Sequence, residues 1–199
     1  MNPVRVLAMA GSARPGSFNG KLLALAAQAA RELGAEVTRL DLRSLALPLY
    51  DAEVEAAGMP AGALELRRLL AQHDALLLAS PEYNGFPTPL LINAFDWASR
   101  TAAAEGLPSG LAVLGGKVAG VMSASPGPMG GLRSLGFTRQ FLHNTLGMLV
   151  VPEQFALVQA GKAFDDQGAL IDAKQMQAVR RVAASVVRMA GALKGSAPV

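Results

Sequence analysis

The sequence contains no cysteine and only two histidines among its 199 residues. The absence of cysteine excludes thiol nucleophiles, disulfides, iron–sulfur clusters and cysteine-ligated zinc. The two histidines, His73 and His143, lie too far apart in the sequence to suggest a metal site. We therefore predict no metal site and expect each histidine to be a surface or capping residue.

Charged and aromatic residues are also scarce, at 17% and 5%. The net charge is +3, but there is no dense run of Lys and Arg. The pairs Arg67-Arg68 and Arg180-Arg181 are more typical of solvated helix faces. A nucleic-acid partner usually requires a basic stripe, so none is expected.

Long apolar runs are absent, and none approaches the roughly 20 residues that span a membrane. The apolar stretch near the start, residues 6–10, is shorter than the roughly 7–15 residues of a signal-peptide core. We therefore expect a cytoplasmic protein without a membrane partner.

What the sequence does contain is a 51% share of hydrophobic residues, mainly Ala, Leu and Val, in alternating short apolar strands and amphipathic helices. Strands are expected at residues 4–10, 36–42, 75–80, 117–123 and 148–151, the last ending at Pro152. Helices are expected at residues 18–33, 62–72, 89–100, 131–146 and 172–193, with an irregular connection over 51–60.

Strand–helix alternation repeated five times predicts an α/β fold with a doubly wound, five-stranded parallel sheet and helices on both faces. The common order for five strands is 2-1-3-4-5, the flavodoxin-like arrangement. One domain over residues 1–193 accounts for the chain, and residues 194–199 are expected to form a flexible tail. The loops after strands 1, 3 and 4 would then line one crevice, near residues 11–19, 81–89 and 124–131.

The first of these loops, GSARPGSFNGK, joins a strand to a helix. It offers the side chains of Ser12, Arg14, Ser17 and Asn19 beside a helix N-terminus, where unpaired N–H groups carry partial positive charge. Together these donors fit one phosphate group, and the alternative is an ordinary turn with Ser17 as N-cap. The loop has neither a Walker A nor a Gly-x-Gly-x-x-Gly pattern, which favours a phosphomonoester.

The second loop, PEYNGFPTP, is stiffened by three prolines and exposes backbone groups able to read the edge of a flat heteroaromatic ring. Tyr83 and Phe86 could flank such a ring, or could instead be packed core or interface aromatics. The third loop, SASPGPMGGLRS, contains Gly127, Gly130 and Gly131, which permit close approach of the backbone to a ligand but are also common in ordinary turns.

Together these residues resemble a known family, the NADPH-dependent FMN reductases, which include quinone, azo-dye and chromate reductases. The resemblance covers roughly residues 4–155 and is carried by Gly11-Ser12-x-Arg14-x-x-Ser17-x-Asn19, Pro81-Glu82-Tyr83-Asn84, Asn93-Ala94-x-Asp96-Trp97 and Gly127-x-x-Gly130-Gly131-x-Arg133. Two features depart from the family pattern. Ile92 stands where family members often have Lys, and the segment Gly85–Pro89 is bulkier and richer in proline than usual.

The resemblance implies that the protein binds FMN and forms a homodimer or homotetramer. It implies phosphate contacts from Ser12, Arg14, Ser17 and Asn19, and ribityl and ring contacts from Pro81, Glu82, Tyr83, Asn84 and Gly85. Ser125 and Gly127 would line the pyrimidine side of the ring, while Asp96 and Trp97 are interpreted as structural.

A bound flavin would carry the chemistry, so no catalytic side chain is expected. NAD(P)H would supply hydride, and a quinone, azo compound, metal oxyanion or free flavin would follow it in a ping-pong mechanism. The choice between NADPH and NADH is left open, with Arg100, Lys117 and Arg133 as candidate partners of the 2′-phosphate.

Two other functions stay open. One is a non-enzymatic electron carrier or flavin-binding module, although carrier flavodoxins are usually acidic and this chain is basic. The other is a hydrolase using Ser12 or Ser125 with a histidine, for which the chain lacks the Gly-x-Ser-x-Gly elbow.

Overall fold

The computed structural model describes residues 2–100 and 106–195, in which five parallel strands form one sheet. The strand order is β2-β1-β3-β6-β7, so the predicted flavodoxin-like order 2-1-3-4-5 is confirmed, with β6 and β7 as the fourth and fifth strands. These strands are β1 (Arg5–Ala10), β2 (Glu36–Leu40), β3 (Ala75–Ala79), β6 (Val118–Ala124) and β7 (Leu149–Leu157).

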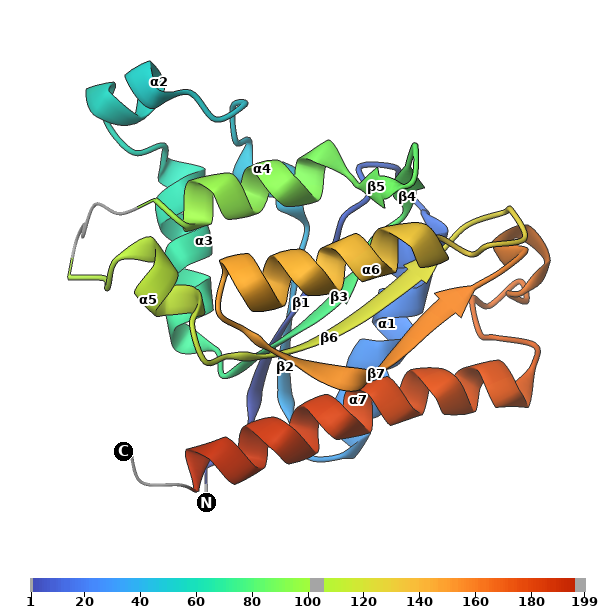
Figure 1. Ribbon diagram of the computed structural model, residues 1–199. Helices are drawn as coiled ribbons and strands as arrows, with labels where there is room; N and C mark the ends of the chain where they lie inside the picture. Colours follow the sequence, from blue (N-terminus) through green and yellow to red (C-terminus); the bar gives the residue numbers. More distant parts are fainter. Residues whose placement is uncertain (1, 101–105, 196–199) are drawn as a thin grey trace.

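Helices cover both faces of this sheet (Figure 1). On one face lie α1 (Phe18–Glu32) and α7 (Ala173–Lys194), and on the other lie α3 (Ala61–Gln72), α4 (Pro89–Ala98), α5 (Gly110–Leu114) and α6 (Leu132–Gln140). The central strands β3 and β6 are buried at every position, which explains why their sequences are apolar except for Ser123, whose hydroxyl donates to the carbonyl of Gly130.

Successive side chains of β3 enter two separate cores, because neighbouring residues of a strand point to opposite faces. Leu77 packs with α1 and α7, whereas Leu76 and Leu78 pack with the helices of the other face. The close packing of α7 on the sheet requires Gly120 in β6. A Cβ atom at that position would lie 2.6 Å from Cγ2 of Val186.

The amino edge of the sheet, where the strands begin, is closed by charged residues with protein partners. The Asp74 carboxylate accepts hydrogen bonds of 2.8 Å from the Arg5 N–H and from Lys194 Nζ at the end of α7. Lys194 also donates to the carbonyl of Pro3 at 2.9 Å. These contacts join the first and last elements of the fold.

His73 lies near this edge as the C-terminal cap residue of α3, as predicted, but it is buried rather than at the surface. Its ring nitrogens contact the carbonyl of Leu69 and the hydroxyl of Thr38. Its own carbonyl accepts a hydrogen bond from Lys117 Nζ. His143 is exposed, which agrees with the prediction of a surface residue, and its ring contacts the carbonyl of Met148.

The fifth strand is longer than predicted and does not end at Pro152. The pairing of Ala119 with Val150 changes to that of Val121 with Gln154, so a bulge takes in the proline. Pro152 has no partner in β6, so its missing N–H interrupts no hydrogen bond of the strand pairing.

Two other predictions are wrong. The connection expected to be irregular contains a short helix, α2 (Ala52–Ala57), which is capped by the Asp51 carboxylate. Arg67 is buried rather than solvated, and its guanidinium donates to the carbonyl of Pro108 at 2.6 Å. Its neighbour Arg68 is exposed, as are the two arginines predicted on the face of α7.

The remaining boundaries shift only slightly. The second strand ends at Leu40 rather than at residue 42, and a 3-10 turn, η1 (Leu42–Leu45), follows it. The helix expected over 131–146 is α-helical as far as Gln140 and continues as a π turn, η2 (Phe141–Thr145). Residues 196–199 of the predicted flexible tail lie outside the described residues. Within residues 2–100 and 106–195, no helix is both long and apolar enough to cross a bilayer.

Candidate functional site

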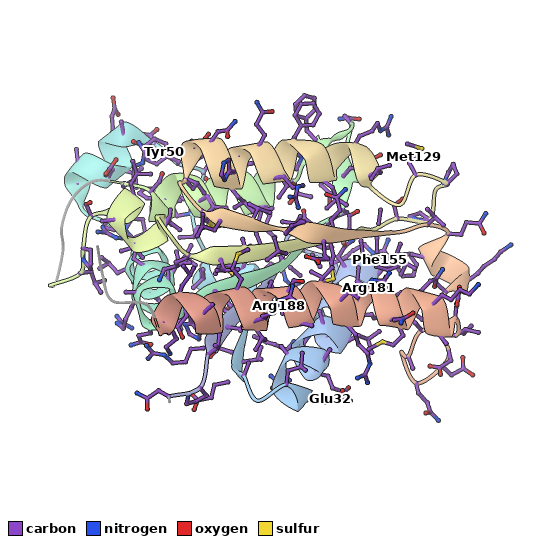
Figure 2. The ribbon with its side chains drawn as sticks, turned by 60° about the horizontal axis from the view of Figure 1, so that its bottom comes forward. Glu32, Tyr50, Met129, Phe155, Arg181 and Arg188 are labelled. Carbon is purple, nitrogen blue, oxygen red and sulfur yellow. The ribbon has the colours of Figure 1, made fainter. Side chains whose placement is uncertain are left out.

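Three loops meet at the carboxyl edge of the sheet, as the strand order predicts (Figure 1). Loop 1 is residues 11–17 after β1, loop 2 is residues 80–88 after β3, and loop 3 is residues 125–131 after β6. Met129 marks loop 3 in Figure 2, beyond the carboxyl end of β6. Each pair of loops is joined by specific polar contacts.

Asn19 joins the start of α1 to the end of β6. Its side-chain amide donates to the carbonyl of Ala124 at 2.8 Å, and its side-chain oxygen accepts the Ala124 N–H at 2.9 Å. The side chain is only 3% exposed. Asn19 therefore places loop 1 next to loop 3, and one of its two amide hydrogens is already used by the protein.

Thr88 joins loop 2 to loop 1. Its hydroxyl donates to the carbonyl of Gly11 at 2.7 Å and accepts the N–H of Leu91, which makes Thr88 the N-cap of α4. Sequence reasoning missed this residue, although a threonine directly before Pro89 is a recognisable helix start.

Glu82 joins loop 2 to loop 3. Its carboxylate pairs with the guanidinium of Arg133 and accepts the backbone N–H groups of Arg133 and Ser134. Helix α6 starts after Gly131, which has no capping side chain, so Glu82 caps this helix from another loop. The hydrogen bond from Arg133 outweighs the opposing effect of burial and holds the pKa of Glu82 below its ordinary value.

Loop 2 contains a small antiparallel hairpin, β4 (Glu82–Tyr83) and β5 (Phe86–Pro87), in place of the expected stiff turn. Asn84 and Gly85 have φ values of 53° and 85°, as the two central residues of a tight hairpin turn require. The Phe86 ring stacks on Phe137 of α6 at 4.4 Å between centroids. Phe86 therefore packs on Phe137, but it remains 56% exposed, as Tyr83 on the same hairpin remains 53% exposed.

The donors expected for a phosphate lie together around the start of α1. The backbone N–H groups of Phe18 and Asn19 have no acceptor within the described residues, since they belong to the first turn of the helix. Ser17 is the N-cap and accepts the N–H of Gly20, which leaves its hydroxyl hydrogen to donate. Ser12 and the exposed Arg14 flank them. This donor set fits a phosphomonoester dianion.

The glycines of loop 3 serve the fold more than a ligand. Gly130 and Gly131 have φ values of 60° and 85°, and a Cβ atom on Gly130 would lie 2.8 Å from the backbone of Leu157. The backbone of Gly130 therefore lies close to β7 and that of Gly131 close to Ser123, so neither glycine borders open space that a ligand could fill. Gly127 is different, because a Cβ there would meet only the Ser125 hydroxyl, at 3.6 Å.

The cations suggested for a 2′-phosphate are engaged or misplaced. Lys117 lies at the amino edge of the sheet, opposite the loops, which rules it out. Arg100 stacks on Tyr50 at 4.6 Å and donates to the Asp96 carbonyl. Arg133 is paired with Glu82.

The hydrolase alternative also fails on geometry. His73 lies at the amino edge and His143 in η2, so neither histidine reaches Ser12 of loop 1 or Ser125 of loop 3. Trp97 has the structural role expected of it, since its buried ring donates to the carbonyl of Pro48 at 2.8 Å.

Sequence comparison assigns the chain to one family. The profile of the NADPH-dependent FMN reductases matches residues 4–162. The chain is 33% identical over 183 residues to an NAD(P)H-dependent FMN reductase of Pseudomonas aeruginosa, covering 89% of this chain and 90% of that protein. It is 35% identical over 174 residues to a quinone reductase of Escherichia coli K12, covering 85% and 86%.

Structural comparison agrees. FerB, a flavoenzyme NAD(P)H:(acceptor) oxidoreductase of Paracoccus denitrificans, superposes with a TM-score of 0.77 at 26% identity, covering 95% of this chain and 98% of that one. A flavodoxin of Streptococcus pneumoniae superposes with a TM-score of 0.55 at 11% identity, covering 94% and 99%, which shows the shared fold alone.

Proposed function

Because this chain belongs to the NADPH-dependent FMN reductase family, we propose that it is an FMN-dependent oxidoreductase that transfers hydride from NAD(P)H to a small acceptor such as a quinone. When bound, FMN supplies the redox chemistry, and the protein supplies binding, orientation and electrostatics. The role of this chain's own residues is therefore to hold the cofactor and keep its surroundings fixed.

The observation that carries the proposal is the set of unpaired donors at the start of α1. Two backbone N–H groups, two serine hydroxyls and the Arg14 guanidinium belong to the N-terminus of α1 and the loop before it. We assign the FMN phosphate to this helix start, with Ser12, Arg14 and Ser17 donating from their side chains. Asn19 contributes its backbone N–H, because its side chain holds Ala124.

The rest of the cofactor is assigned to loops 2 and 3. Pro81, Tyr83, Asn84 and Gly85 contact the ribityl chain and ring, and Ser125 and Gly127 line the pyrimidine side. Glu82 contributes through its backbone, since its carboxylate caps α6. Backbone N–H groups at the pyrimidine edge stabilise the negative charge that reduction places there.

A visible absorption spectrum of the purified protein, followed by identification of the released flavin, tests the cofactor assignment. We expect FMN to bind far more tightly than riboflavin, since only FMN carries the phosphate. Equal affinities for the two flavins would remove the basis for placing a phosphate at α1.

Steady-state kinetics test the reaction. One site that serves reductant and acceptor in turn gives parallel lines in double-reciprocal plots, the pattern of a ping-pong mechanism. Quinones, azo compounds, metal oxyanions and free flavin are the acceptors to compare. Intersecting lines would mean that both substrates bind at once, and no oxidation of NAD(P)H by the FMN-loaded protein would favour the electron carrier.

We also propose that the protein is a homodimer or homotetramer. Apolar side chains lie exposed on the β4–β5 hairpin, loop 3 and α6, beside the proposed flavin site: Tyr83, Phe86, Met129, Leu132 and Phe137. A contiguous apolar surface of this kind commonly marks an interface. A monomeric mass by light scattering at micromolar concentration would exclude this assembly. The cytoplasmic location stays a prediction.

A further inference from the structure

A second pocket lies beside loop 1, on the side away from loops 2 and 3. Its volume is about 540 Å³, and its walls come from loop 1, the first half of α1 and the chain that leaves β2. None of its lining residues belongs to loop 2 or loop 3. Ser12, Arg14 and Ser17, to which the flavin phosphate is assigned, belong to its lining, so the pocket includes the proposed phosphate site but lies apart from the loops assigned to the flavin ring.

The lining of this pocket concentrates the positive charge of the chain. Four cations, Arg14, Lys21, Arg39 and Arg43, line it together with one carboxylate, Asp41. This surplus of three positive charges matches the net charge of +3 of the whole sequence. The rest of the chain is neutral on balance, so anions are drawn to this side of the molecule.

The single carboxylate is paired with one of these arginines, Arg43, and makes no hydrogen bond or ion pair with Arg14 or Arg39 among the described residues. Asp41 accepts hydrogen bonds from the backbone N–H of Arg43 at 3.0 Å and from its guanidinium at 2.9 Å. These bonds from Arg43 hold the pKa of Asp41 below its ordinary value. Within the described residues, the guanidiniums of Arg14 and Arg39 make no hydrogen bond or ion pair. Because Arg14 is assigned to the flavin phosphate, Arg39 is the guanidinium of this pocket that is left for a second ligand.

The remaining walls are apolar and suit the body of a nucleoside. Ala10, Leu23, Ala24 and Leu40 line the pocket between the charged residues. Its volume lies in the range of roughly 300–1,000 Å³ typical of small-molecule sites. A ligand with a phosphate at one end and a flat or sugar-like body at the other would match both kinds of wall.

We propose that this pocket binds the adenosine 2′-phosphate end of NADPH, with Arg39 as the residue that selects NADPH over NADH. The inference rests on the proposed function, since it takes NAD(P)H as the reductant. Arg39 lies in β2 and Arg43 just after it, so both approach from the side of loop 1 opposite to loops 2 and 3. Planar guanidiniums bind phosphate through paired hydrogen bonds, and NADH lacks the group that they would bind.

The first measurement is equilibrium binding to the FMN-loaded protein without turnover. Adenosine 2′,5′-bisphosphate and 5′-AMP, titrated by calorimetry, differ only in the 2′-phosphate. We expect the bisphosphate to bind more tightly, and we expect Arg39→Gln to reduce its affinity about tenfold, the loss that follows removal of one hydrogen bond to a charged group. Arg39→Lys should keep part of the preference, and Arg68→Gln, an exposed arginine on α3, should keep all of it.

The second measurement is the Michaelis constant for each nucleotide. In Arg39→Gln the KM for NADPH should rise about tenfold, while the KM for NADH and the affinity for FMN stay unchanged. Equal binding of the two adenosine nucleotides by the wild-type protein would overturn the proposal. So would a loss of FMN affinity in Arg39→Gln, because the pocket would then hold the flavin phosphate.

These outcomes separate this inference from the proposed function. An FMN-loaded enzyme that oxidises both NADPH and NADH but shows no preference for a 2′-phosphate defeats only the inference. An inactive FMN-loaded protein defeats the proposed function, and the calorimetric titration still decides what the pocket binds. Inorganic phosphate that binds as tightly as the bisphosphate would show a general anion site and would overturn the assignment to adenosine.

Discussion

The two edges of the sheet use charge in opposite ways. At the amino edge, charged side chains bind one another, as Lys194 binds Asp74. At the carboxyl edge, neutral groups such as Asn19 hold the loops together, and Arg14 and Arg39 have no protein partner within the described residues. The comparison teaches that charge is paired at the amino edge, whereas the carboxyl edge has the pairs Glu82–Arg133 and Asp41–Arg43 but also arginines without a partner among the described residues. Four substitutions test this difference.

The largest effect is expected at Asn19, where a neutral side chain carries the connection between loops. Asn19→Ala leaves the buried N–H and C=O of Ala124 without partners, at a cost of roughly 2–4 kcal/mol of unfolding free energy. Because loops 1 and 3 then separate, FMN and riboflavin should both bind more weakly. Urea unfolding of the apo-protein and two flavin titrations measure this, with the exposed Asn144→Ala as control. A loss for FMN alone would mean that Asn19 acts as a phosphate ligand instead.

The next effect is expected at Arg14, which faces the ligand side. Arg14→Ala should weaken FMN binding about 10–100-fold, since a hydrogen bond between charged groups contributes about 1.5–3 kcal/mol. Riboflavin affinity should hardly change, and the stability of the apo-protein should stay within about 0.5 kcal/mol. At saturating FMN, turnover should largely recover. If both flavin affinities fall together, Arg14 belongs with the residues that hold the loops.

At the amino edge we expect a smaller change in stability and none in flavin binding. Burial alone would raise the pKa of Asp74, but the hydrogen bonds from Lys194 and the Arg5 N–H outweigh it, so its pKa lies below the ordinary value. A carboxyl with a lowered folded-state pKa stabilises the protein above its unfolded pKa of about 3.9, and this stabilisation is lost as the pH falls through the folded value.

Asp74→Asn should therefore cost about 1 kcal/mol at pH 7. The difference from the wild type should fade as the pH falls below about 4. Urea unfolding at several pH values measures it. A difference in unfolding free energy between Asp74→Asn and the wild type that persists at low pH would show that the side chain acts through packing rather than charge. A change in FMN affinity would show that the amino edge also affects the flavin site.

The smallest effect is expected for the one ion pair at the carboxyl edge that joins two loops. Glu82→Gln keeps the shape of the side chain but weakens the contact with the exposed Arg133, so both flavins should lose affinity by at most about fivefold. Glu65→Gln breaks a similar exposed pair within α3 and should change neither affinity. A loss confined to FMN would place Glu82 near the phosphate and contradict the assignment of its carboxylate to α6.

The sheet order was predictable because five alternating segments leave few right-handed topologies, and the three loops follow from that order. The hairpin was equally readable, since Asn84-Gly85 is a strong signal for a tight turn, but the flanking prolines directed the interpretation to a rigid loop. Asp51, the N-cap of α2, was likewise visible in the sequence, but the six residues of this helix are too few to show a helical hydrophobic periodicity.

The contacts between the loops could not be read from the sequence. Asn19 and Ala124 are 105 residues apart, and Thr88 and Gly11 are 77 apart, so only the folded sheet brings them together. The same holds for Glu82, whose role as the cap of α6 depends on where loop 2 ends in space. A motif names residue types, whereas the division between those that hold the site and those that face the ligand depends on tertiary contacts.

The hydrogen bond from Lys194 to the carbonyl of Pro3 has a practical consequence. It brings the beginning of the chain and the end of α7 to one corner of the molecule, at the amino edge (Figure 1). A short linker between these ends would let the chain be circularly permuted, with new ends opened in an exposed connection elsewhere. Attachment to an electrode through that same corner would leave the three loops, with the proposed flavin site, facing the solution.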